Sequence, residues 1–156
     1  MPLYSVLDML HGYLHGDQEK INLLARNQYF VVPMLNTDGC WKIMDHYNKT
    51  GEMLLKRKNM DTRFESPSDN CPEHEHGVDI NRNYGYIWGN TDGPCGESFP
   101  GPHPFSEPES RAMRNLLFKY QDTIKFVYNF HAYGPMWVWP YNGEKENELA
   151  ESNPVA

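Results

Sequence analysis

Apolar side chains recur at helical spacing in three parts of the chain. Residues 3–15 carry leucines and a valine at intervals of three and four, and the pattern ends at Gly16-Asp17. A shorter helical segment follows over residues 18–27. Residues 106–121 begin with Ser-Glu-Pro-Glu, the order of a capping box with proline in the first turn. We therefore predict helices over these three ranges.

Three other segments are predicted to be strands. Residues 29–35 form a nearly continuous apolar run before Asn36-Thr37-Asp38-Gly39, which is typical of a strand buried on both faces and followed by a turn. Residues 124–131 and 136–141 are similar in character. We expect residues 40–105, rich in Gly, Pro, Asn and Asp, to be mainly irregular, and to build a site or be braced by cross-links. The prediction is one α/β domain with a mixed, mainly parallel sheet.

Composition excludes several classes of protein. The 156 residues are 39% hydrophobic and 13% aromatic, as in a globular chain, and the formal net charge is −7. That charge argues against nucleic-acid binding, which needs a basic face. No apolar run approaches the roughly 20 residues of a membrane span. The first residues show no signal-peptide pattern, so the compartment stays open.

Histidines are the first candidates for chemistry. His131 ends a predicted strand, where ligands gather in open sheets, so it could be a metal ligand or a general base. The more frequent alternative is a histidine bonded to backbone. His11 and His15 share a helix face, but no glutamate follows His11 as in metalloprotease helices. His74-Glu75-His76 is interpreted as a solvated loop.

Arginines are the second candidates. Arg82 lies between two asparagines, and such a cation with amide donors suits a carboxylate, although a local ion pair is the alternative. Arg57, between Lys56 and Lys58, could stabilise an oxyanion. For a lone basic cluster a solvated loop is the more frequent interpretation.

Several motifs follow one another in a recognisable order. They are Val32-Pro33-Met34-Leu35-Asn36-Thr37-Asp38-Gly39, Lys56-Arg57-Lys58-Asn59, Gly77-Val78-Asp79-Ile80-Asn81-Arg82-Asn83-Tyr84, Pro94-Cys95-Gly96-Glu97-Ser98-Phe99-Pro100-Gly101, Pro104-Phe105-Ser106-Glu107-Pro108-Glu109, Phe130-His131-Ala132-Tyr133-Gly134 and Trp139-Pro140-Tyr141. In this order they resemble the motifs of the zinc carboxypeptidases of the carboxypeptidase A/B type, and the resemblance extends over roughly residues 3–142. The resemblance implies a three-layer fold of helix, sheet and helix, and zinc-dependent removal of the C-terminal residue of peptides.

The resemblance also implies roles for single residues. His131 would be a zinc ligand, and Arg57 would polarise the scissile carbonyl and hold the oxyanion. Asn81 and Arg82 would bind the terminal carboxylate of the substrate, and Tyr133 would line its cleft. A secreted or lysosomal location would fit the family.

Three cysteines are present, and their number alone allows one disulfide or three thiols. The resemblance implies a disulfide between Cys71 and Cys95, bracing the long loop and leaving Cys40 as a thiol.

The resemblance also implies that parts of the family's active site lie outside residues 1–156. The family's H-x-x-E motif, with two further zinc ligands, would precede residue 1, and its general-base glutamate and mobile tyrosine would follow residue 156. We therefore expect residues 1–156 to be a partial catalytic domain with negligible peptidase activity and weak zinc affinity by itself. One alternative is a non-catalytic module that binds peptide C-termini. A more remote one is a different metal protein using His11, His15 and the loop histidines.

Overall fold

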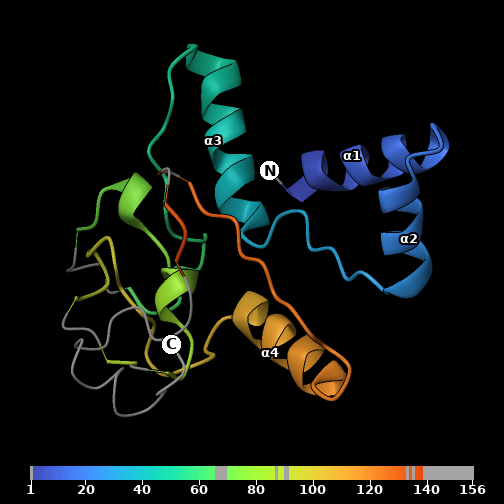
Figure 1. Cartoon of the computed structure of the whole chain (residues 1–156). Coiled ribbons are helices and arrows are strands. Elements are labelled where there is room, and N and C mark those ends of the chain that lie inside the picture. Colours follow the sequence, from blue (N-terminus) through green and yellow to red (C-terminus); the bar gives the residue numbers. More distant parts are fainter. Residues whose placement is uncertain are drawn as a thin grey trace.

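The computed structural model describes residues 2–65, 70–86, 88–89, 92–132, 134 and 136–138. Its elements in chain order are α1 (Pro2–Leu14), α2 (Gln18–Arg26), α3 (Thr37–Thr50), the 3-10 turns η1 (Glu73–Glu75) and η2 (Ile80–Arg82), and α4 (Pro108–Tyr120). Figure 1 shows α1 and α2 on one side, α3 and α4 in the middle, and the two 3-10 turns among loops on the other side.

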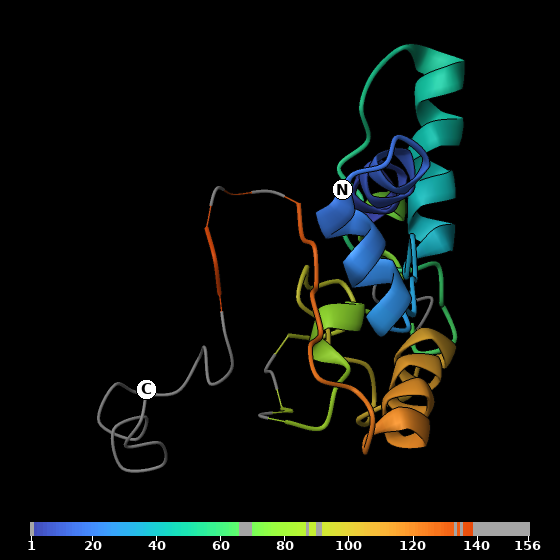
Figure 2. The same ribbon diagram turned by 45° about the vertical axis from the view of Figure 1, so that its right-hand side comes forward.

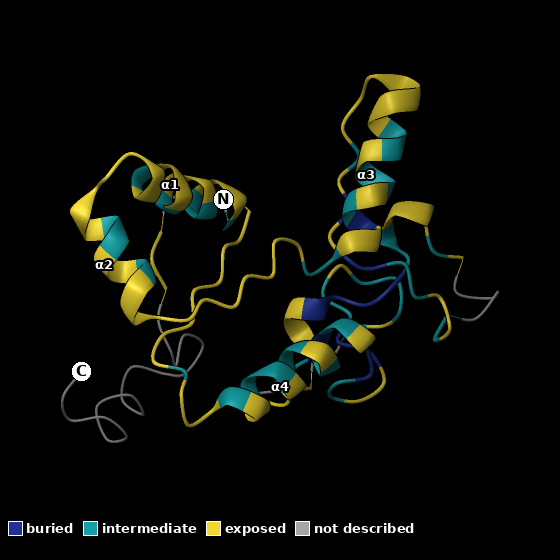
Figure 3. Cartoon of the chain, turned by 90° about the vertical axis from the view of Figure 1, so that its right-hand side faces the viewer, coloured by how far each residue is buried: buried dark blue, intermediate teal, exposed yellow. Residues whose placement is uncertain are grey.

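The first two predicted helices are confirmed and pack on each other. Asp17 begins α2 because its side chain accepts hydrogen bonds from the main-chain N–H groups of Glu19 and Lys20, at 3.0 and 3.3 Å. Lys20 also pairs with Asp8 of α1. No residue of either helix is buried among those described, so the apolar stripe of α1 faces outward (Figure 3).

Helix α3 was not predicted. The residues interpreted as a turn after a strand begin it, because the Asn36 carboxamide accepts a hydrogen bond from the Gly39 N–H at 3.0 Å. The helix ends at Gly51, whose φ of 76° is left-handed and whose N–H donates to the Tyr47 carbonyl at 2.8 Å. The expectation that residues 40–105 are mainly irregular is therefore wrong for residues 40–50.

Helix α4 confirms the third prediction, but it begins differently from the predicted capping box. The N-cap is Glu107, and its side chain makes no capping hydrogen bond. The Ser106 hydroxyl instead donates to the Glu107 carboxylate at 2.8 Å. Pro108 stands in the first turn, where its missing N–H costs nothing.

The predicted sheet is contradicted, because no strand occurs among the described residues. Residues 29–35 and 124–131, both predicted strands, have no regular secondary structure, and 136–138 of the third are likewise irregular. Most side chains of these segments are exposed, with Val31 at 43%, Phe126 at 80% and Tyr128 at 71%. An apolar run becomes a strand only when neighbouring strands accept its main-chain hydrogen bonds, and the described residues supply none. The α/β three-layer fold class is therefore wrong for the described structure.

Burial is concentrated in residues 51–107, which we call the loop lobe, and at the start of α4 (Figure 3). Within the described part the buried hydrophobic side chains are those of Val78 and Ile80. Pro100 is buried as well, and the remaining buried side chains are polar: Lys56, Lys58, Asn59, Asp79, Asn83, Ser106, Glu107 and Ser110. After α4, residues 121–132 run back past the loop lobe (Figure 2). The core is thus held mainly by hydrogen bonds.

Candidate functional site

Two segments of the loop lobe lie side by side and carry the predicted arginines. The N–H of Asn59 donates to the Val78 carbonyl at 3.0 Å, and the Asn59 carboxamide oxygen accepts from the Val78 N–H at 2.8 Å. The close approach depends on Gly77, whose φ is +99°, since a Cβ there would lie 2.1 Å from the Asn59 carbonyl oxygen. This pairing brings the segment of Arg57 against the one that leads into η2.

Asp79 connects the two segments through its side chain. Its Oδ2 accepts a hydrogen bond from Arg57 Nε at 2.8 Å, and its Oδ1 accepts one from the Asn81 N–H at 3.0 Å. The second bond caps η2, which carries Asn81 and Arg82. Asp79, whose side chain is 3% exposed, therefore connects Arg57 to the turn on which Asn81 and Arg82 lie.

The carboxylate-binding candidates face outward. Asn81 and Arg82 are exposed, and no described residue makes a hydrogen bond or an ion pair with either side chain. The Arg57 side chain is 37% exposed, and only its Nε has a partner among the described residues. These donors are thus open to a ligand, and two guanidinium groups with an amide suit an anion with several oxygens.

The two lysines beside Arg57 are buried, so the solvated-loop interpretation is wrong for them. Lys58 donates from Nζ to the carbonyls of Pro94 and Gly96, at 2.6 and 3.1 Å, and Lys56 donates to the His76 carbonyl. Burial lowers the pKa of Lys56 to about 8, and it also lowers the pKa of Lys58. Both ammonium groups thus brace the loop on either side of the outward Arg57.

Asn83 is the centre of a second network, under the site. Its side chain is fully buried. Its Nδ2 donates to Pro100 O at 2.8 Å, His103 O at 3.2 Å and Ser106 Oγ at 2.7 Å, and its Oδ1 accepts from Glu107 N at 3.1 Å and Ser110 Oγ at 2.5 Å. Asn83 directly follows η2, so these bonds fix the turn that carries Arg82 to the start of α4.

Glu107 completes that network from α4. Its carboxylate is fully buried and accepts from Asn59 Nδ2 at 2.7 Å and from the Ser106 hydroxyl. Burial raises the pKa of Glu107, and the nearby Asp61 carboxylate adds to the rise. No role in the site was predicted from the sequence for Asp79, Asn83 or Glu107. Their positions inside the motifs named above were the one sign that they could belong to it.

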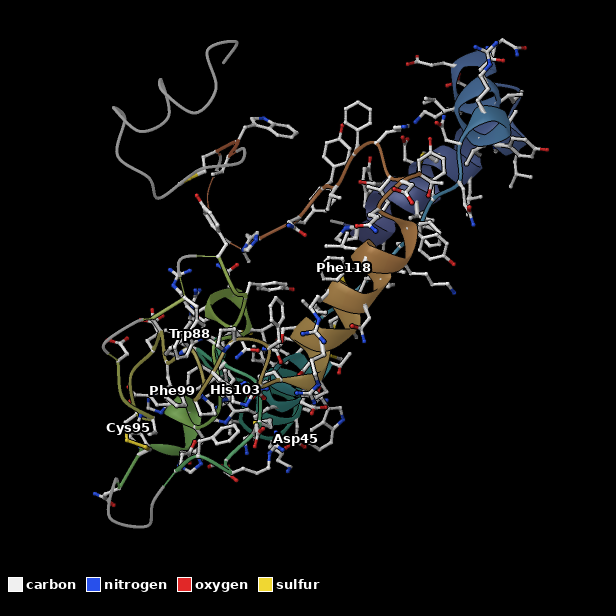
Figure 4. All side chains as sticks on the ribbon, turned by 90° about the horizontal axis from the view of Figure 1, so that it is seen from below. Asp45, Trp88, Cys95, Phe99, His103 and Phe118 are labelled. Atoms are coloured by element: carbon white, nitrogen blue, oxygen red, sulfur yellow. A yellow bond between two sulfur atoms is a disulfide. The ribbon has the colours of Figure 1, made fainter. Side chains whose placement is uncertain are left out.

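A disulfide joins Cys71 and Cys95, whose Cα atoms are 5.1 Å apart, and Cys40 is a free thiol. Figure 4 shows Cys95 in the loop lobe with Trp88, Phe99 and His103, while Phe118 lies apart on α4. The cross-link closes the loop whose carbonyls receive Lys58. It therefore stabilises the loop to which Lys58, the neighbour of Arg57, is hydrogen-bonded.

The described residues do not form a zinc site by themselves. Catalytic zinc takes three protein ligands, and no three His, Cys, Asp or Glu side chains converge in the described part of the chain. His131 is exposed in the segment after α4. His11 and His15 stack on each other at 4.0 Å, and His15 Nδ1 bonds to the His11 carbonyl. Tyr133 lies outside the described residues.

His76 also departs from a solvated loop. It is half-buried, and its Nε2 contacts the Cys71 carbonyl at 2.9 Å.

In the part of the chain that the structure describes, no helix has the length and apolar character needed to cross a bilayer.

Comparison with known proteins identifies the family. The model of the family Zinc carboxypeptidase matches residues 1–154. The chain is 33% identical to carboxypeptidase B of Astacus astacus over 88% of this chain and 42% of that protein. It is 35% identical to mast cell carboxypeptidase A of Rattus norvegicus, over 76% and 26%, and 32% identical to carboxypeptidase A6 of Homo sapiens, over 81% and 27%. The chain thus spans less than half the length of these relatives. Because the family model matches nearly the whole chain, the chain belongs to the zinc carboxypeptidases, a zinc-dependent family.

Proposed function

We propose that this chain contributes the part of a metallocarboxypeptidase that binds the C-terminus of a peptide, in an enzyme that hydrolyses off the terminal residue. One observation carries the proposal: the buried Asp79 connects Arg57 to the turn that carries Asn81 and Arg82, and no described residue pairs with the outward donors of these three side chains. Membership of the zinc carboxypeptidase family supports the reaction class.

Arg82 and Asn81 bind the terminal carboxylate in this proposal. A guanidinium presents parallel N–H donors at the spacing of two carboxylate oxygens, and the asparagine amide adds a further donor. Both residues lie on η2, whose start is capped by Asp79. The turn therefore presents the two donors from a fixed backbone, which limits the ordering cost of binding.

Arg57 acts on the carbonyl next to the terminal residue. Its Nε is occupied by Asp79, so its terminal nitrogens are left for a substrate oxygen. Preorganised donors of this kind stabilise the negative charge that develops on a carbonyl oxygen during hydrolysis. In the family, zinc supplies the activated water. The described residues of this chain do not hold the metal, so they bind and orient the peptide.

We further propose that the 156-residue chain alone does not hydrolyse peptides. His131 has no second or third ligand among the described residues, and a single imidazole does not retain zinc at micromolar concentration. Zinc titration by calorimetry is expected to show no stoichiometric uptake. Uptake at micromolar zinc that is lost in His131→Ala, or release of the terminal residue seen by mass spectrometry, would refute this part.

The binding part is tested with two peptides that differ in one group. The probes are an N-acetylated tripeptide with a free C-terminal carboxylate and the same peptide as a C-terminal amide. Since charge-assisted hydrogen bonds contribute roughly 1.5–3 kcal/mol, the carboxylate form should bind about tenfold tighter or more. Arg82→Gln should abolish the difference. The matched control is Arg26→Gln, an exposed arginine at the end of α2, which should leave it unchanged. Equal affinity of both peptides for the unaltered chain would refute the proposal.

A second candidate is a non-catalytic module that binds peptide C-termini. The observation that favours it is the same: the described residues gather carboxylate-binding side chains without three converging metal ligands. The two candidates predict different polypeptides in the cell. An antibody against the loop lobe should detect a longer chain if the residues serve an enzyme, and a 156-residue chain if they serve a module.

A further inference from the structure

The Asp79 side chain connects the Arg57 side chain to the main chain of η2. Its two oxygens have separate partners, with Arg57 Nε 2.8 Å from Oδ2 and the Asn81 N–H 3.0 Å from Oδ1. Arg57 precedes Asp79 by 22 residues, so the bond joins two distant parts of the chain. The other bond holds the first turn of η2, which ends at Arg82.

The carboxylate is itself held in place. The Asp79 N–H donates to the Phe99 carbonyl at 2.8 Å, and the preceding Val78 is paired with Asn59. The side chain is 3% exposed, and Arg57 is its ion-pair partner. Asp79 thus has little freedom to turn.

We propose that Asp79 is a positioning residue that fixes the Arg57 guanidinium relative to η2, so that Arg57 and Arg82 bind neighbouring oxygens of one peptide C-terminus. The inference rests on the proposed function and adds a residue to it. A free arginine side chain samples many rotamers, and anchoring its Nε leaves a forked pair of nitrogens in one orientation. Asp79 touches no substrate atom, so its effect passes entirely through Arg57 and the cap of η2.

The variant Asp79→Asn separates the two contacts. Asparagine keeps one carbonyl oxygen for the Asn81 N–H, as asparagine does at helix starts, but it offers Arg57 no charged acceptor. Arg57→Lys breaks the same bond from the exposed side, keeping the positive charge but removing the Nε donor. The matched control is Asp38→Asn, an exposed aspartate in the first turn of α3.

Each variant of the full chain is titrated with the carboxylate peptide and its amide, and the exchange rate of the Arg57 Nε–H is measured by NMR without peptide. Because Arg57 binds the carbonyl oxygen, which both peptides carry, Asp79→Asn is expected to weaken both peptides by a similar factor, about threefold or more, and to keep the carboxylate preference that Arg82 and Asn81 supply. The Arg57 Nε–H should exchange faster. Arg57→Lys should weaken both peptides in the same way, and Asp38→Asn should change neither affinity.

The outcomes distinguish positioning from a merely structural role. An unchanged affinity for both peptides in Asp79→Asn, or a loss confined to the carboxylate peptide, would overturn the inference. If Asp79→Asn does not fold, the Arg57 Nε–H in the unaltered chain decides: exchange as fast as that of the exposed Arg26 overturns the inference, and slower exchange supports it. If the unaltered chain has no preference, the proposed function fails, and the positioning role fails with it. A preference that is present while both affinities are insensitive to Asp79 leaves the proposed function standing.

Discussion

The substitution Asn83→Ala should destabilise the loop lobe far more than its neighbour Asn81→Ala. Asn83 is fully buried and makes five side-chain hydrogen bonds, whereas Asn81 is exposed and its side chain has no partner among the described residues. The two positions carry the same residue type two positions apart. The comparison therefore isolates burial and bonding from the chemistry of the side chain.

The size of the effect follows from the groups that Asn83 leaves behind. Alanine cannot replace the acceptor of the Glu107 N–H or the donor to the Pro100 carbonyl, and both residues are buried. A buried main-chain group without a partner costs about 1–3 kcal/mol, so two such groups cost about 4 kcal/mol. That is a large share of the ~5–15 kcal/mol by which folded domains are stable. Asn81→Ala should change stability by less than about 0.5 kcal/mol.

Urea unfolding followed by circular dichroism at 222 nm measures the global effect for both variants. Amide hydrogen exchange over residues 77–84 shows whether the loss is in the loop lobe, where protection should fall in Asn83→Ala alone. A change of less than about 1 kcal/mol in Asn83→Ala, with protection retained, would contradict the view that this side chain supports η2 and the start of α4.

Three further predictions use the same unfolding assay. Gly77→Ala should cost on the order of 3 kcal/mol, because the added Cβ would clash with the Asn59 carbonyl and the φ of this residue is left-handed. Gly93→Ala has open space around its Cβ and should cost less than about 1 kcal/mol, so similar costs for the two variants would contradict the reasoning. Since the folded-state pKa of Lys56 is lowered from 10.5 to about 8, stability should rise with pH above 8. The rise should be smaller in Lys56→Met, where the lowered pKa of Lys58 still contributes, and an unchanged slope in that variant would contradict the assignment. Reducing the disulfide, which closes a separation of 24 residues, should cost about 3.5 kcal/mol. An unchanged unfolding midpoint would contradict a stabilising role of the cross-link.

The helices with a regular apolar pattern could be predicted from the sequence, and the rest of the fold could not. Helices α1, α2 and α4 depend on main-chain bonds within each segment, which local spacing reveals. A strand at residues 29–35 depends on partners elsewhere in the chain, which no local pattern guarantees. For α3, the side chain of Asn36 fits a turn and a helix start equally well, and its bond to Gly39 selects the helix.

The candidate site divides in a similar way. Arg57, Asn81 and Arg82 could be selected from charge, residue type and the order of the motifs, and their roles in binding stay predictions. The proposed role of Asp79 could not be predicted, because it depends on a contact with Arg57, which is 22 positions away in the sequence. The burial of Lys58 could not be predicted either, because lysine is almost never buried unless its charge is satisfied. The acceptors that satisfy it are main-chain carbonyls of a loop, and no residue type in the sequence reveals such acceptors.

The polar interior of the loop lobe has a thermodynamic consequence. Exposing apolar surface raises the heat capacity of unfolding, whereas exposing polar surface lowers it. Among the described residues of this lobe, Val78, Ile80 and Pro100 are the buried apolar side chains, against seven buried polar ones, from Lys56 to Glu107. Unfolding this lobe should therefore change the heat capacity by less than the usual ~12–15 cal/mol/K per residue. The lobe would then have a flat stability curve, with an enthalpy of unfolding that varies little with temperature.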